Sequence, residues 1–269
     1  MLHGDPASEA FLSEIIGAAA FPGRRHMSME SIYEYGSRAG VWRILDLFRS
    51  RQIPLTMFAV GMAMQRHPAV IEQCLKDGHE IASHAHRWIN FDDMPIEQER
   101  ALMDAAIDAH QTIVGEKPKG WYTGRTSENT RALVAERDHI LYDADDYSDD
   151  LPFWSTQVEK PHLVVPYTLD TNDMRFTQVQ GFNKGDDFFE YLKDAFDVLY
   201  AEGEAGAPKM LSIGMHCRLL GRPARLASLA RFLDYVKSHD KVWCARRVDI
   251  ARHWHATHPF RATEQESRQ

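Results

Sequence analysis

The feature of this sequence that most constrains the fold is the alternation of short apolar segments with helical patterns along the chain. Segments rich in β-forming residues predict seven strands, over residues 55–60, 79–83, 119–123, 139–143, 163–168, 209–215 and 241–244. Apolar residues at helical spacing predict helices over residues 8–19, 31–51, 96–114, 127–137, 186–202, 222–239 and 246–255. Alternation of this kind gives parallel strands with helices outside them. We therefore expect an α/β fold, a closed or nearly closed (β/α) barrel of the TIM type, with an open doubly wound sheet as the alternative.

Composition narrows the class of protein. The chain has 269 residues, 44% of them apolar and 26% charged, which predicts one large soluble domain over residues 1–269. A net charge of −8 makes nucleic acid and anionic membranes poor partners, and no apolar run is long enough to cross a bilayer. Cys74, Cys217 and Cys244 form no CxxC pair, so we expect a reducing, cytoplasmic compartment, with neither disulfides nor a structural zinc.

Polar side chains collect where the predicted strands end, which is where a parallel barrel carries its chemistry. The residues at these ends include His84, Tyr122, Arg125, Asp146, Asn172, His216 and Arg218. Each also has a purely structural interpretation: a lone histidine at a strand end is usually a packed residue, and the acidic run over 143–150 is typical of a solvated loop. His84 and His216 occupy matching places on different strands, which favours a functional site.

His84 and His86 form an HxH pair. Alternation along a strand would point both side chains the same way, so the pair could bind one metal ion. No later set of ligands is obvious in the sequence, and the pair follows the second predicted strand rather than the first. A metal-dependent amidohydrolase is therefore an alternative interpretation.

Six segments in order make the chain resemble the polysaccharide deacetylase superfamily and, within it, the metal-independent bacterial allantoinases. They are residues 27–40, 78–84, 120–126, 166–176, 215–223 and 242–254. Deacetylases of this family bind a metal ion through an aspartate and two histidines spaced His-x-x-x-His; His84 matches the first histidine, and Trp88 stands at the second. Tyr122 and Gly124 replace the family's arginine–proline motif, and its late histidine matches His216. Ala85 and His86 depart from the allantoinase pattern, which has glycine and an aromatic residue there.

The resemblance implies a hydrolase of purine catabolism that opens a ring amide of allantoin, a small ureide, to give allantoate. It implies no metal cofactor, a cytoplasmic homo-tetramer, and His84 and His216 as catalytic residues whose acid and base roles stay open. An acid from residues 143–146 could orient one of these histidines. The substrate-binding residues would be Trp88, Tyr122, Arg125, Asp146, Asn172 and Arg218.

The family's barrel begins with a strand whose acidic motif supplies the catalytic base, a glutamate in the allantoinases. That strand should lie just before residues 2–5, so we expect a barrel that lacks its first strand. Two further interpretations follow: a metal-dependent polysaccharide deacetylase or amidohydrolase that uses His84 and His86, and an inactive, shortened paralogue.

Overall fold

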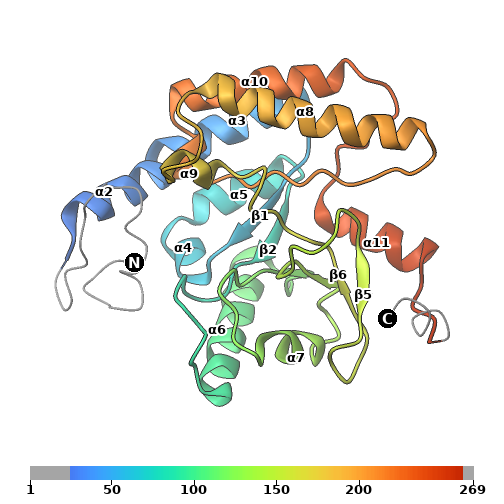
Figure 1. The fold of residues 1–269 in the computed structure, drawn as a ribbon. Helices are drawn as coiled ribbons and strands as arrows, with labels where there is room; N and C mark the ends of the chain where they lie inside the picture. The colour runs from blue at the N-terminus through green and yellow to red at the C-terminus, as the bar shows by residue number, and fades with distance from the viewer. Residues whose placement is uncertain (1–24, 263–269) are drawn as a thin grey trace.

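The computed structural model describes residues 25–262, and its centre is a six-stranded sheet with the strand order β1-β2-β3-β4-β6-β5 (Figure 1). The strands are β1 (Thr56–Ala59), β2 (Glu80–Ser83), β3 (Gly120–Trp121), β4 (Tyr142–Asp143), β5 (Phe153–Ser155) and β6 (His162–Val164). Neighbours from β1 to β6 run parallel, and only β5 is antiparallel to its partner. The predicted α/β class with a mostly parallel sheet is confirmed.

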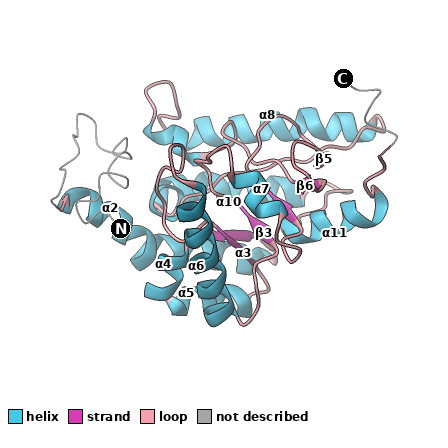
Figure 2. Ribbon diagram, turned by 90° about the horizontal axis from the view of Figure 1, so that it is seen from below, coloured by secondary structure: helices cyan, strands magenta, loops and turns pink. Residues whose placement is uncertain are grey.

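Helices surround this sheet (Figure 2). They are α2 (Met27–Tyr35), the π-helix η1 (Gly36–Gly40), α3 (Val41–Arg51), α4 (Gly61–Arg66), α5 (Pro68–Lys76), α6 (Ile96–Val114), α7 (Thr130–Ala135), the 3-10 helix η2 (Asp173–Thr177), α8 (Gly185–Glu204), α9 (Cys217–Leu220), α10 (Pro223–Lys237) and α11 (Arg247–Thr257). Within residues 25–262 no helix is both long and apolar enough to cross a membrane. The helix predicted over residues 8–19 lies outside the described residues.

The helix predicted over residues 31–51 is divided by the π-helical turn η1. A side chain on Gly40 would lie 1.9 Å from the carbonyl oxygen of Cys217, so only glycine lets α9 approach this turn so closely. The π-helical turn η1 therefore lies against the start of α9. These two segments are far apart in the sequence, so helical periodicity cannot predict their contact.

Two of the seven predicted strands, over residues 209–215 and 241–244, are wrong. Both segments line a cavity of about 1530 Å³ that also borders β1, and Gly214 alone makes an isolated bridge, to Asn172. A strand forms only where its backbone groups meet those of a neighbour. Within residues 25–262, β1 pairs only with β2, and no backbone segment pairs with β1 across the cavity. Residues 209–215 make backbone bonds only at Met210 and Gly214, to Asp150, Thr171 and Asp173. The sheet is therefore open here within residues 25–262, and the short strand β5 was not predicted.

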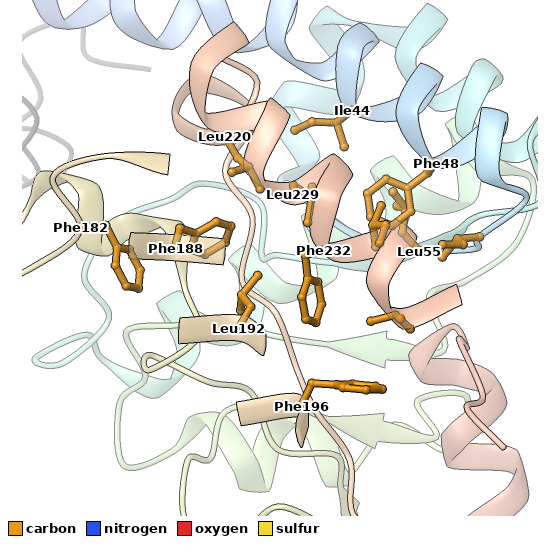
Figure 3. Packing of buried hydrophobic residues seen from close by; sticks show 13 residues of the cluster. Ile44, Phe48, Leu55, Phe182, Phe188, Leu192, Phe196, Leu220, Leu229 and Phe232 are labelled. Atoms are coloured by element: carbon orange, nitrogen blue, oxygen red, sulfur yellow. The ribbon is translucent and has the colours of Figure 1, made fainter. Parts of the chain in front are cut away.

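An apolar cluster packs α3, α8 and α10 together (Figure 3). On α8, Phe188, Leu192 and Phe196 lie four residues apart and so share one face of the helix. Leu220 of α9 is fully buried in the same cluster. Burial of a side chain of this size contributes about 1.5–3 kcal/mol. The cluster therefore anchors α9, which begins immediately after His216.

Candidate active site

The cavity of about 1530 Å³ extends to the carboxyl ends of the strands, where the sequence predicts the site. Seven of the eight predicted site residues line it: His84, Trp88, Tyr122, Arg125, Asn172, His216 and Arg218. Asp146 lines instead a separate polar cavity of about 310 Å³, where its carboxylate pairs with Arg131 at 3.0 Å. The cavity thus brings together side chains that lie more than 130 residues apart in the chain.

His84 follows β2, and its contacts define its protonation. The ring nitrogen Nδ1 lies 2.8 Å from the backbone carbonyl oxygen of Tyr122. A carbonyl oxygen only accepts hydrogen bonds, so Nδ1 carries the proton and donates it. The imidazole also stacks on the Tyr122 ring, with centroids 5.0 Å apart. Burial, with smaller contributions from the nearby His216 and Arg125, lowers the pKa of His84 to about 4. At neutral pH the ring is uncharged and Nε2 bears a lone pair.

This neutral ring predicts a pH-dependent loss of stability. The unfolded chain binds a proton at His84 below its ordinary pKa of 6.5, whereas the folded chain does so only near pH 4. The stability that this difference contributes is present above about pH 6.5 and is lost as the pH falls toward 4. We expect the free energy of unfolding of the native chain, relative to that of His84→Asn, to fall over this window in urea titrations. The exposed His253→Asn is the control, and an equal pH dependence in both variants would contradict the prediction.

His216 is held by a buried carboxylate. Its Nδ1 lies 2.6 Å from Oδ1 of Asp173, whose side chain is fully buried. The other oxygen, Oδ2, accepts hydrogen bonds from the backbone N–H groups of His216 and Leu220, at 2.8 and 3.1 Å. A carboxylate in this position fixes the imidazole tautomer and stabilises the imidazolium. Asp173 was not among the predicted site residues, and the acid that orients a histidine is this residue rather than one from 143–146.

Asn172 and Asp145 hold the site's loops. The amide of Asn172 accepts from the Met174 backbone at 3.0 Å and donates to the Thr168 carbonyl at 3.1 Å, so it caps η2 and fixes Asp173. Asp145 accepts from the backbone N–H groups of Thr123 and Gly124, at 2.7 and 2.6 Å. These two bonds fix the loop that carries Arg125.

Trp88 forms a platform under two guanidinium groups. The Arg125 and Arg218 guanidinium carbons lie 4.8 and 5.4 Å from the centre of a Trp88 ring, and Tyr33 packs beside it with centroids 6.0 Å apart. Such stacking orients a guanidinium and favours its charged form. Tyr147, which was not predicted, lines the cavity and contacts the Tyr122 hydroxyl at 3.1 Å.

The described residues do not fit a resident metal ion. No three histidine, cysteine, aspartate or glutamate side chains within residues 25–262 converge as a ligand set. The backbone of Ala85 is left-handed, with φ of 56°, so the alternation expected of a strand ends between His84 and His86. His86 packs against Gly61, where a Cβ would lie 2.8 Å from its Nδ1. The two histidines therefore do not form the pair that the HxH pattern predicted.

Comparisons with known proteins agree with this architecture. Residues 25–141 match the family model for polysaccharide deacetylase. A protein of Schizosaccharomyces pombe whose name places it among the polysaccharide deacetylases is 43% identical over 97% of this chain and 87% of its own length. A peptidoglycan deacetylase of Helicobacter pylori is 22% identical over 77% of this chain and 81% of its own.

Two solved structures are very similar. One is a probable polysaccharide deacetylase from Pseudomonas aeruginosa PAO1, with 65% identity and a TM-score of 0.91 over 94% of this chain and 85% of that one. The other is PuuE allantoinase, with 67% identity and a TM-score of 0.91 over 94% of this chain and 84% of that one. The chain belongs to the polysaccharide deacetylase family.

Proposed function

We propose that this protein hydrolyses a ring amide of allantoin to give allantoate, with protein groups and without a metal ion. The observation that carries the proposal is the Asp173–His216 pair at a cavity where Trp88 occupies the position of the family's second metal-binding histidine. The 67% identity to PuuE allantoinase supports the substrate. Hydrolysis of allantoin would place the protein in purine catabolism. The cytoplasmic location and the homo-tetramer remain predictions.

His216 acts as the base and then as the acid. With Nδ1 on Asp173, Nε2 takes a proton from water while the water oxygen bonds to the ring carbonyl carbon. The resulting imidazolium then gives that proton to the ring nitrogen as the carbon–nitrogen bond breaks. The new carboxylic acid ionises to the carboxylate of allantoate. Asp173 stabilises the imidazolium between the two steps.

Arg125 and Arg218 stabilise the oxyanion that forms on the attacked carbonyl. Both guanidiniums lie over Trp88, so their donors are oriented before the substrate enters. Oriented donors of this kind contribute about 100- to 1000-fold to the rate, because they need no reorganisation during the reaction. Tyr122 and Tyr147 extend this polar wall with their hydroxyl groups.

A hydrolysis assay with chelator tests the proposal. Allantoin is expected to be converted to allantoate at equal rates before and after prolonged dialysis against EDTA. N-acetylated peptidoglycan fragments, which the names of several relatives suggest, are expected to release no acetate. Loss of allantoin turnover in EDTA, restored by zinc, would show metal-dependent catalysis instead. Acetate release without allantoin turnover would contradict the assigned substrate.

A further inference from the structure

We infer that His84 is a specificity residue: its Nε2 accepts a hydrogen bond from a ring N–H of the substrate and transfers no proton. The expected ligands are therefore cyclic ureides in which the ring nitrogen facing His84 carries a hydrogen and no substituent. The inference rests on the proposed function for the identity of the substrate, and it separates two histidines that the sequence pattern treats alike.

The first step is the tautomer of His84. Nδ1 must donate, because its partner at 2.8 Å is the Tyr122 carbonyl oxygen. The imidazole also stacks on the Tyr122 ring, with 28° between the planes, which favours the orientation that makes this bond. In the neutral ring Nε2 is therefore an acceptor only.

The second step is the contrast with His216. Both rings donate through Nδ1, but His84 donates to a neutral carbonyl and His216 to the carboxylate of Asp173. A carboxylate stabilises a positive imidazolium, whereas a neutral carbonyl beside two guanidiniums does not. Proton exchange therefore falls to His216, and His84 stays neutral throughout the reaction.

The third step is the match to the ligand. A cyclic ureide has carbonyl oxygens that accept and ring N–H groups that donate. The guanidiniums of Arg125 and Arg218 can only donate, so they suit the carbonyls. The amide of Asn172 is engaged within the chain through Met174 and Thr168. His84 Nε2 supplies the acceptor that a ring N–H requires.

Two variants divide the functions of the ring. In His84→Asn the amide nitrogen can retain the bond to the Tyr122 carbonyl, while the acceptor at the Nε2 position is lost. In His84→Gln the longer side chain can place an amide oxygen near that position. We expect His84→Asn to raise KM for allantoin roughly three- to tenfold, with kcat within about threefold of the native value. His84→Gln should recover part of this loss.

Methylated ligands identify the N–H. On the native chain, methylation of one ring nitrogen of hydantoin should weaken binding by roughly 10- to 100-fold, because the methyl group meets the lone pair. In His84→Asn that penalty should shrink to a few fold. Calorimetric titration of hydantoin, 1-methylhydantoin and 3-methylhydantoin measures this without turnover. Failure of the chain to hydrolyse allantoin would thus refute the proposed function and leave this inference testable.

Three results would overturn the inference. One is a loss of kcat above about a hundredfold in His84→Asn at unchanged KM, which would make His84 a proton-transfer group. Another is a methylation penalty that is undiminished in that variant. The third is EDTA-sensitive binding of hydantoin, which would make the lone pair a metal ligand. Nitrogen-15 NMR of histidine-labelled protein should show the His84 ring in its neutral form from pH 8 to 5, with the proton on Nδ1 and none on Nε2. The His84 signal is assigned by its absence from the spectrum of His84→Asn.

Discussion

Replacement of His216 by alanine is expected to lower kcat for allantoin hydrolysis by about 100- to 10,000-fold, the contribution of a positioned acid–base group. The variant should still fold, because the His216 side chain is partly exposed and its backbone bond to Asp173 remains. The measurements are kcat by allantoate formation and Tm by circular dichroism. The exposed His255→Ala is the matched control and should retain native kcat. Retention of more than a tenth of the native kcat in His216→Ala would refute the assigned role.

The variant Asp173→Asn tests whether catalysis depends on the orientation of the His216 imidazole as well as on its presence. An asparagine amide can accept only through its oxygen, so either the His216 ring or the backbone N–H groups of His216 and Leu220 lose their acceptor. We expect a fall in kcat comparable to that of His216→Ala, with little change in KM. A rise in KM at native kcat would instead show that Asp173 contributes to binding alone.

The clustering of His84, Tyr122 and Arg125 was predictable, because they follow the neighbouring parallel strands β2 and β3, whose carboxyl ends lie at one edge of the sheet. His216 and Arg218 line the same cavity, although the strand predicted before them does not form. Helix α6 was predicted to the residue because Pro95 precedes it and Gly115, with φ of 91°, ends it. These signals are local, so the sequence displays them directly.

Other features depend on contacts that the sequence does not display. Asp173 and His216 are 43 residues apart, and their pairing depends on how residues 171–173 lie against Gly214. Residues 209–215 have the composition of a strand, but their backbone meets the cavity where a strand would need a neighbour. The HxH prediction failed for a different reason. The positive φ of Ala85 turns the backbone between His84 and His86, and strand alternation does not predict such a conformation.

Arg247 was not singled out by the sequence, yet it joins α11 to the segment that follows β6 and to Ser212. Its side chain, only 9% exposed, donates to the carbonyl oxygens of Val165 and Pro166 at 2.7 and 3.0 Å, and to the Ser212 hydroxyl. The guanidinium carbon lies 5.6 Å from the centre of the Phe58 ring, which packs against Tyr122. Arg247 therefore supports the aromatic side chain on which His84 stacks.

Glu80 is the buried acid near this guanidinium. It accepts hydrogen bonds from the Thr56 and Tyr142 hydroxyls and the Val248 N–H, at 2.6, 2.9 and 2.9 Å. Burial raises the pKa of Glu80, whereas these bonds and the charge of Arg247 oppose that rise. The two buried charges thus stabilise each other, so removal of one leaves the other without compensation.

Arg247→Met is therefore expected to lower the free energy of unfolding by about 3–5 kcal/mol, the usual cost of leaving a buried charge and its acceptors uncompensated. Methionine fills much of the same volume, so the loss reports the polar contacts rather than a cavity. Urea unfolding at pH 7.5 measures it. Arg252→Met is the matched control on the same helix: its side chain is 57% exposed, and its ion pair with Asp249 spans 3.8 Å, so its loss should change stability by less than about 1 kcal/mol. If Arg247→Met and Arg252→Met unfold at the same urea concentration, the polar contacts of the Arg247 guanidinium do not stabilise the fold. In that case α11 would be held by its apolar contacts through Val248 and Ala251.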